Sequence, residues 1–267
     1  MSYIATDIRP VDFSICQYGK SPFFLRGRKV RTNGRYWVCL GGQKTYAEDI
    51  VLPFSQQLER GFGVPVVNMG IPYSGPDAVC EDKDLSTVIS GAEMVIFEPL
   101  SMVNHTNPFY RVHPRRNDRF ICPMPALTTL YPEMDFTDCH FTKHLLCKLL
   151  VCDPARFETV RDALEREWTI KMQRLARLMR RAIAWSIAPA GSRTEISDIL
   201  TVKTSDLELL SSHVVCADIK SHHALFPENI TQADHNQIFD LLQHEIVRIS
   251  DDLALEIQFE ASYPQPQ

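Results

Sequence analysis

Short apolar runs alternate with longer amphipathic segments along most of the chain. The apolar runs have the length of buried strands and lie at residues 36–40, 64–68, 94–98, 182–188 and 213–219. Helical spacing of apolar residues marks the segments at about 49–61, 78–90, 135–151, 153–178 and 231–250. Strands that alternate with helices predict an α/β fold, a three-layer α/β/α sandwich around a mostly parallel five-stranded sheet.

Two helix ends carry local signals. Asp153 followed by Pro154 is typical of an N-cap and a first helical position, so we expect a long helix to begin there. The sequence Gly61-Phe62-Gly63 predicts the end of the helix that begins near residue 49.

The remaining segments have less periodicity. Residues 1–35 predict an extended arm that packs over the domain, with turns at Gly19, Gly27 and Asn33-Gly34. Residues 99–125 predict a long irregular loop with a functional or structural role. Residues 251–267 predict an edge strand and a C-terminal tail. Because the chain shows no internal repeat and no linker, we expect residues 1–267 to form a single domain.

Composition excludes several classes of function. The net charge of −5 argues against a polyanion-binding protein, and nucleic-acid binding is the weakest hypothesis. A basic set spaced at three and four residues predicts a solvated helix face: Lys171, Arg174, Arg177, Arg180 and Arg181. The eight cysteines form no CxxC pair, which indicates reduced thiols. We find no signal peptide and no membrane-spanning run, so we expect a cytoplasmic protein.

No cofactor or metal is predicted. His222, His223 and His235 lack acidic or cysteine partners at a ligand spacing. No glycine-rich phosphate loop is present. Cys16 and Cys39 have no neighbouring base that would make either one a nucleophile.

The loop directly after the first predicted strand is the most informative segment. It reads LGGQKTYA over residues 40–47 and lies where α/β proteins place their chemistry. Its central residue is Gln43, whose amide has no hydroxyl or thiol and does not titrate. The segment therefore indicates a site more clearly than a reaction.

Several blocks resemble those of the SGNH or GDSL hydrolases, which implies an SGNH-like or flavodoxin-like sandwich. LGGQKTYA resembles the GDSxTxG block, with Gln43 at the position of the serine nucleophile and Thr45 at that of the conserved threonine. The resemblance implies that Gly70 and Asn104 hold the oxyanion-hole positions. Phe226 stands where the catalytic histidine would be, so the resemblance implies a triad that lacks both nucleophile and base.

Five ordered blocks resemble a second, uncharacterised family common in alphaproteobacteria. The blocks are CQYGKSPFFLRG, LGGQKTYAEDIVLPF, VVNMGIPYSGPDA, NPFYRVHPRRNDRF and YPEMDFTDCHFTKHLL. Members of that family usually show LGGSETYG in the second block. The chain from about Trp185 onward is similar to the family only loosely.

The densest group of charged side chains follows the third predicted strand. It contains His113 and four arginines, Arg111, Arg115, Arg116 and Arg119. Guanidinium groups match carboxylate, sulfate and phosphate oxygens, so the arginines could form an anion clamp. Alternatively, they pair with Asp118, Asp135 or Glu133 and fix the loop. His113 is the one candidate for acid or base chemistry, or else it orients its neighbours.

Two functional hypotheses follow. The first is a catalytically degenerate SGNH-like protein that binds a polar or anionic ligand, of carbohydrate or acyl type, or serves as a subunit of a homo-oligomer or larger assembly. Its ligand-binding residues would be Gln43, Thr45, Gly70, Asn104, His113, Arg115, Arg116 and Arg119. The alternative is a glycan-modifying transferase or hydrolase that uses His113 and the arginine-rich loop. Neither hypothesis requires a membrane.

Overall fold

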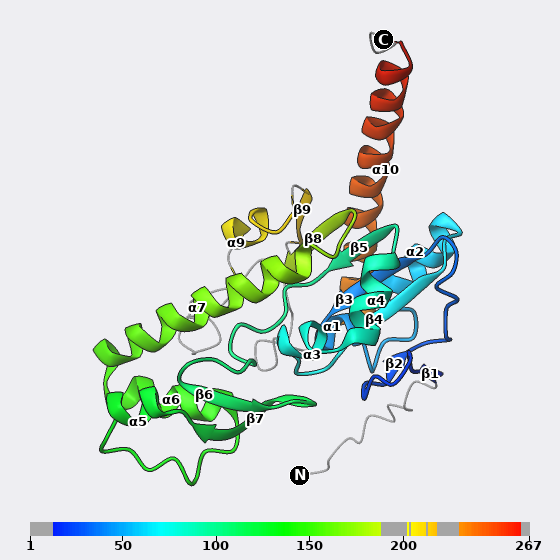
Figure 1. The fold of residues 1–267 in the computed structure, drawn as a ribbon. Coiled ribbons are helices and arrows are strands. Elements are labelled where there is room, and N and C mark those ends of the chain that lie inside the picture. Colours follow the sequence, from blue (N-terminus) through cyan, green and yellow to red (C-terminus); the bar gives the residue numbers. More distant parts are fainter. Residues whose placement is uncertain (1–12, 188–201, 203, 212, 218–229, 263–267) are drawn as a thin grey trace, which may run out of the picture.

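A five-stranded parallel sheet forms the centre of the molecule (Figure 1). The computed structural model describes residues 13–187, 202, 204–211, 213–217 and 230–262, of which residues 187, 204, 215–217 and 251–262 are described by their backbone alone. The strands are β3 (Trp37–Gly41), β4 (Val66–Gly70), β5 (Met94–Phe97), β8 (Ala182–Ile187) and β9 (His213–Ala217). Every neighbouring pair is parallel. The predicted fold class is confirmed.

The spatial order of the strands is β4-β3-β5-β8-β9. The chain therefore starts in an inner strand, moves outward to β4, and then crosses β3 to continue through β5 to β9. If the five strands of this sheet are renumbered 1 to 5 in chain order, their spatial order is 2-1-3-4-5, which is the flavodoxin-like arrangement. The direction in which successive strands are added reverses between β3 and β5. A reversal of this kind leaves a crevice outside the carboxyl ends of the two strands.

Helices cover both faces of the sheet, because side chains alternate between the faces along each strand. On one face, Trp37 and Cys39 pack in a cluster with residues of α2 (Phe54–Phe62) and α10 (Gln232–Ser262). On the other, Val38 and Leu40 join the larger cluster, which includes residues of α3 (Asp77–Cys80), α4 (Lys83–Gly91) and α7 (Pro154–Ala176). The result is a three-layer arrangement.

The helix ends that the sequence predicts from adjacent residues agree with the structure. The side chain of Asp153 accepts a hydrogen bond from the N–H of Arg156 at 2.9 Å, so it caps α7 as predicted. Gly63 ends α2 in the left-handed conformation with φ of 65°. The predicted helix at 78–90 is divided into α3 and α4, and the carboxylate of Asp82 caps the second of them. The helix predicted over 135–151 is α6 (Thr142–Cys152), and α5 (Pro125–Leu130) precedes it.

The segment predicted as an irregular loop contains an antiparallel hairpin, β6 (Tyr110–His113) and β7 (Arg116–Pro123). Tyr110 and Val112 are buried while Arg111 and His113 are exposed, so the strand period of two is present. The hairpin is short, and the pairing register of its two strands shifts twice, between residues 111 and 112 and between 112 and 113. These bulges hide the alternation in the sequence.

Within residues 13–35, the N-terminal segment packs against the central sheet. It forms a small antiparallel pair, β1 (Ile15–Cys16) and β2 (Leu25–Arg26), and β2 contacts the outer edge of β4. Leu25 and Val30 are buried. The expected turns at Gly19 and Gly27 have positive φ angles, which glycine adopts without steric cost.

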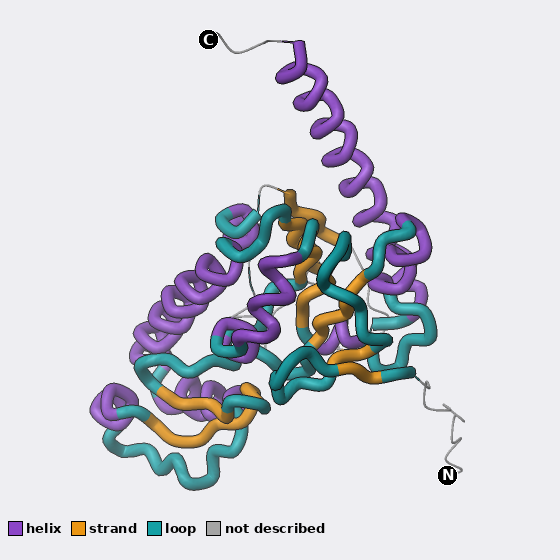
Figure 2. The backbone as a smooth tube through the Cα atoms, turned by 45° about the vertical axis from the view of Figure 1, so that its right-hand side comes forward, coloured by secondary structure: helices purple, strands orange, loops and turns teal. Residues whose placement is uncertain are grey.

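The C-terminal segment differs from the prediction. Residues 251–262 continue α10 as helix and do not form an edge strand, and residues 263–267 lie outside the described part. Neither glycine nor proline interrupts the sequence from Gln232 to Ser262, so no local signal stops the helix. Figure 2 shows its C-terminal half extending away from the rest of the molecule.

The basic set predicted for one solvated helix face is divided. The helix α7 ends at Ala176, so Arg177, Arg180 and Arg181 lie beyond its last residue. The ammonium group of Lys171 points inward, 2.6 Å from the carboxylate of Asp77 and 2.6 Å from the carbonyl of Thr106. Lys171 therefore ties α7 to α3 and to the segment after β5.

The cysteines whose side chains are described are free thiols, and burial raises the pKa of the Cys39 thiol. In the part of the chain that the structure describes, none of the helices combines the length and apolarity needed to cross a membrane.

His235 joins α10 to α2 as a buried neutral base. Its Nδ1 accepts the N–H of Phe54 at 3.1 Å, and its ring stacks on the Phe54 ring with centroids 5.6 Å apart. Burial, with a smaller contribution from Arg26, lowers the pKa of His235 to about 4. Burial, together with the charge of Lys171, also lowers the pKa of His105 to about 4.

These histidines predict a loss of stability in mild acid. An unfolded histidine binds a proton below about pH 6.5, whereas the folded forms resist protonation until about pH 4. The free energy of unfolding should therefore be highest above pH 6.5 and fall by roughly 2–3 kcal/mol per histidine down to pH 4. We expect His235→Gln to flatten this slope between pH 6.5 and 5 in urea unfolding, and the exposed control His140→Gln to leave it unchanged. An unchanged slope in His235→Gln would contradict the assignment.

Candidate functional site

A small cleft opens at the carboxyl edge of the sheet, where β3, β4 and β5 end. Its volume is about 240 Å³. Residues from the three following loops line it: Gly42, Gln43, Lys44, Tyr73, Ser74, Glu98, Pro99, Ser101 and Asn104. The cleft therefore lies at the point where the winding of the sheet reverses, which is the usual place for a ligand in open α/β sheets.

Glu98 is the central charged residue of the cleft. It directly follows β5 and is 8% exposed. One carboxylate oxygen lies 3.2 Å from the ammonium group of Lys44. The other accepts the N–H of Gly42 at 3.2 Å and the hydroxyl of Thr45 at 3.0 Å. The carboxylate is therefore held by one opposite charge and two hydrogen-bond donors, as a buried charge requires.

The loop after β3 can approach this carboxylate only because of a glycine. A Cβ on Gly41 would lie 2.1 Å from the Thr45 hydroxyl oxygen and 2.8 Å from the Glu98 carboxylate. Just beyond it, Gln43–Tyr46 forms the short helix α1, which ends at Ala47 in the left-handed conformation with φ of 58°. The sequence LGGQKTYA is thus a tight strand-to-helix turn that wraps one carboxylate.

Two polar side-chain atoms of residues that line the cleft lack a partner among the described residues. The side-chain oxygen of Gln43 and the hydroxyl of Ser74 are both buried, and neither forms a hydrogen bond with a described residue. Most buried polar atoms in proteins have a partner, and the exceptions require an explanation. A ligand that donates to the Gln43 oxygen and bonds to the Ser74 hydroxyl would supply it.

Tyr73 stands at the rim of the cleft in a strained conformation. Its φ is 59°, a value that non-glycine residues rarely adopt, and the residue is 45% exposed. The guanidinium of Arg116 lies 5.6 Å from the centre of its ring. Strained backbone of this kind concentrates at binding and catalytic sites.

The structure brings only some of the predicted site residues together at the cleft. Gln43 and Asn104 line the cleft together, and Thr45 lies directly beneath it. The Asn104 amide is engaged, since its Nδ2 donates to the carbonyl of Tyr73 at 3.1 Å and its Oδ1 accepts the hydroxyl of Thr142 at 2.7 Å. Asn104 therefore connects the loop after β4 to α6.

Gly70 does not line the cleft. Its N–H donates to the side chain of Asn68 at 2.9 Å, so it is not available as the expected oxyanion donor. A Cβ on Gly70 would lie 2.1 Å from the backbone nitrogen of Tyr46. The glycine is needed because α1 packs directly on β4.

The arginine-rich hairpin does not form a converging clamp. Arg116 lies near Asp118, at 3.4 Å, and over Tyr73. Arg119 stacks on the ring of Phe141 at 4.3 Å, and Arg115 is exposed. Of the three acids expected to fix this loop, only Asp118 pairs with one of its arginines, while Glu133 binds Arg156. Asp135 accepts hydrogen bonds from Thr137.

His113, the one catalytic candidate, lies exposed where the hairpin turns. Its Nδ1 accepts the backbone N–H groups of Arg115 at 3.2 Å and Arg116 at 3.3 Å. The imidazole thus supports the backbone of the turn. It is not among the residues that line the cleft.

Some predicted positions cannot be compared. Phe226, His222 and His223 lie outside the described residues. Within the described part, no group of three histidine, cysteine or acidic side chains is arranged to hold a metal.

The sequence interpretation missed Glu98, Lys44, Tyr73 and Ser74. Glu98 did carry a signal, since a carboxylate directly after the apolar run Met94–Phe97 must lie at the carboxyl edge of a parallel sheet. Lys44 carried none, because only the folded turn brings its side chain back toward β5.

A family model described as a domain of unknown function, DUF6473, matches residues 1–224. The chain belongs to this family. The DUF6473 match includes all five strands of the sheet and every residue that lines the cleft, and it ends before α10. A comparison with curated proteins gave no match.

The carboxylate at the centre of the DUF6473 cleft should be needed for stability. We expect Glu98→Gln to lower the free energy of unfolding by roughly 1–3 kcal/mol, because Lys44 loses its counter-charge and the donors of Gly42 and Thr45 lose a charged acceptor. Chemical denaturation followed by circular dichroism measures the change. The control Glu158→Gln breaks only an exposed pair with Arg161 and should cost about 0.5 kcal/mol or less. Equal effects would show that Glu98 has no special role.

The contact between Gly70 and α1 gives a second prediction. Gly70→Ala should destabilise the protein by about 1–3 kcal/mol, because the new methyl group meets backbone atoms that cannot rotate away. Gly34→Ala is the matched control, since nothing lies within 4 Å of its Cβ position. The two melting temperatures should differ clearly. If Gly70→Ala melted together with Gly34→Ala, the close packing of α1 on β4 would be disproved.

Proposed function

We propose that the cleft binds one unit of a hydroxyl-rich ligand, of carbohydrate type, without transforming it. The observation that carries this proposal is the pair of buried, unpartnered polar atoms, the Gln43 oxygen and the Ser74 hydroxyl. Both belong to a cleft at the reversal point of the sheet.

The chemistry of the lining favours a neutral polar ligand. The charge of Glu98 is balanced by Lys44, so the two together leave no net charge at the cleft. Gln43 offers an acceptor and Ser74 offers a hydroxyl, which match the donors and acceptors of sugar hydroxyl groups. The exposed ring of Tyr73 provides an apolar surface beside them. A volume of about 240 Å³ suits a single small unit.

The same lining gives little support for hydrolysis. An amide at position 43 cannot act as a nucleophile, and the lining contains Ser74 and Ser101 but no imidazole. A degenerate relative of the SGNH hydrolases would retain the cleft and lose the reaction. We favour this version of the proposal, in which the protein binds the ligand without hydrolysing it. Service as a subunit of a larger assembly is compatible with it.

A second candidate is a transferase or hydrolase that acts on an acidic glycan through His113 and the hairpin arginines. One observation favours it, since Arg116 lies over the rim residue Tyr73 and would attract an anionic group. Against it, Nδ1 of His113 is occupied by backbone donors. We therefore rank it second.

Ligand binding is tested by saturation-transfer NMR and calorimetry with a panel of neutral and acidic monosaccharides. Gln43→Ala and Ser74→Ala should each weaken binding of the best panel member roughly tenfold, the effect of removing one buried hydrogen bond. Gln173→Ala, on α7, removes the amide of a residue that does not line the cleft and should leave the Kd unchanged. Failure of every sugar to show Gln43-dependent binding would contradict the proposal.

The same variants separate binding from catalysis. The protein should not hydrolyse activated acyl esters in a manner that depends on Gln43. Turnover that His113→Ala abolishes, with the melting temperature unchanged, would favour the second candidate.

A further inference from the structure

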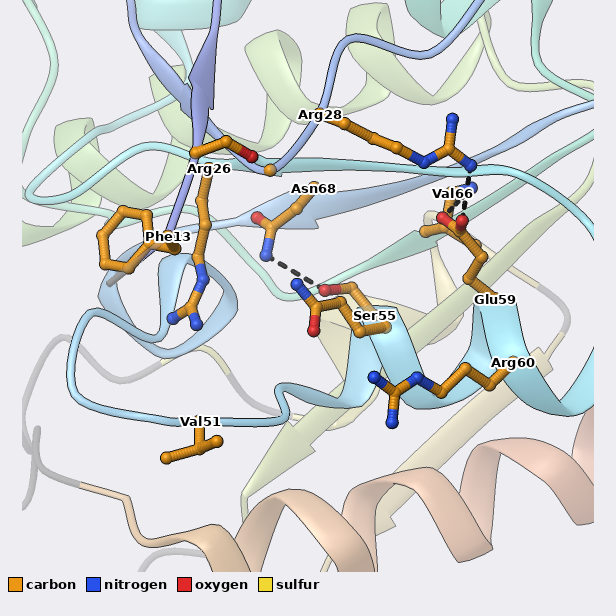
Figure 3. A pocket seen from close by; sticks show the side chains of 12 residues that line it. Phe13, Arg26, Arg28, Val51, Ser55, Glu59, Arg60, Val66 and Asn68 are labelled. Atoms are coloured by element: carbon orange, nitrogen blue, oxygen red, sulfur yellow. Dashed lines mark hydrogen bonds and ion pairs between the residues drawn. The ribbon is translucent and has the colours of Figure 1, made fainter. Parts of the chain in front are cut away.

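A second pocket lies on the opposite side of β4 from β3, between the N-terminal pair β1–β2 and α2 (Figure 3). Its volume is about 430 Å³. Three arginines and one acid are among its lining residues: Arg26, Arg28, Arg60 and Glu59. The excess of arginine over glutamate distinguishes it from the charge-balanced cleft.

Arg26 is a buried cation without a carboxylate partner among the described residues. It is 2% exposed, and its guanidinium donates to the carbonyls of Tyr46, Ala47 and Ile50. Its Nε is buried and has no hydrogen-bond partner. Burial lowers the pKa of Arg26, and electrostatic interactions with Tyr46 and then Asp49 oppose this shift. Carbonyl dipoles solvate such a charge but do not neutralise it.

The other two arginines of the pocket, Arg28 and Arg60, differ in their ion pairing. Arg28 binds the carboxylate of Glu59 at 2.5 Å, and the second oxygen of Glu59 accepts the N–H of Val66 at 3.1 Å. Glu59 is therefore fully engaged. Arg60, one residue later on α2, is exposed and has no acidic partner within the described part of the chain. Figure 3 shows Arg26 reaching the pocket from β2 and Arg60 from α2.

The rest of the lining adds hydrogen bonding and apolar surface. Ser55 already accepts the amide N–H of Asn68 at 3.0 Å, which leaves its hydroxyl hydrogen for a further acceptor. Phe13 lies under the guanidinium of Arg26, 4.3 Å from its centre, and Val51 and Val66 line the same pocket. The lining thus offers several hydrogen-bond donors to an oxyanion and apolar contacts to the rest of a ligand that carries this anion.

We propose that this pocket binds a small ligand through an oxyanion, a phosphate or a carboxylate, held by Arg26 and Arg60. Guanidinium groups bind both anions through paired hydrogen bonds. An anion here would complete the charge balance that the described residues leave open. The site is separate from the cleft, so its test does not depend on the proposed sugar binding.

Calorimetry in chloride buffer tests it with two probes, inorganic phosphate and citrate. We expect at least one probe to bind, with an affinity that falls as salt rises, because the interaction is between charges. Arg60→Gln should weaken that binding roughly tenfold, as expected for loss of one charge-assisted hydrogen bond. Arg166→Gln removes the same charge from an exposed position on α7 and should change the Kd less than about twofold.

The design keeps structural effects apart from binding. Arg26 also holds the backbone of residues 46–50, so Arg26→Lys is informative only if its circular dichroism spectrum is that of the parent; it should then bind more weakly than Arg60→Gln. Preference for phosphate over citrate, or the reverse, identifies the anion. Absence of binding by both probes, or equal Kd values for the parent and Arg60→Gln, would overturn the proposal. The Gln43→Ala variant should bind the probe normally.

Discussion

The carboxylate of Glu98 is the interaction on which the geometry of the cleft depends. It lies at the end of β5 and receives the Gly42 N–H, the Thr45 hydroxyl and the Lys44 ammonium group, all from the loop after β3. These are the two strands between which the winding of the sheet reverses, so one buried charge closes the floor of the crevice that the topology opens. A carboxylate in this position costs desolvation energy, and the three donors offset that cost.

The short helix α1 is held from both sides. A four-residue helix has almost no stability of its own, so its neighbours decide where it lies. Glu98 binds Thr45 from the cleft side, and from the edge of the sheet Asn68 donates to the Thr45 carbonyl at 2.8 Å while Arg26 binds the carbonyls that follow. The N-terminal arm thus contributes to the shape of a cleft that it does not line. The two pockets have no lining residue in common, and they differ in charge.

The glycines that suggested a reaction centre have packing roles. Gly41 allows Thr45 and Glu98 to approach the strand end, and Gly70 allows α1 to lie on β4. Ala47 occupies a left-handed position where the related LGGSETYG pattern has glycine, at a cost of about 1 kcal/mol for a residue with a Cβ. The hydrolase-like pattern of residues 40–47 coincides with a tight strand-to-helix turn. The presence of such a turn does not by itself indicate catalysis.

The sequence by itself determined the features that depend on neighbouring residues. The five strands followed from short apolar runs, and α7 followed from Asp153 and Pro154, because burial patterns and caps are local. It also determined that Gln43 would lie at the carboxyl edge of the sheet. Only the tertiary structure decided that Glu98 faces Lys44, that Gly70 supports α1, and that Arg26 is buried without an acid among the described residues. The bulged hairpin was likewise not recognised, because its register shifts hide the alternation of buried and exposed residues. The contacts of Glu98, Gly70 and Arg26 join residues that are far apart in the sequence and that meet only after the sheet has assembled, so no periodicity in the chain records them.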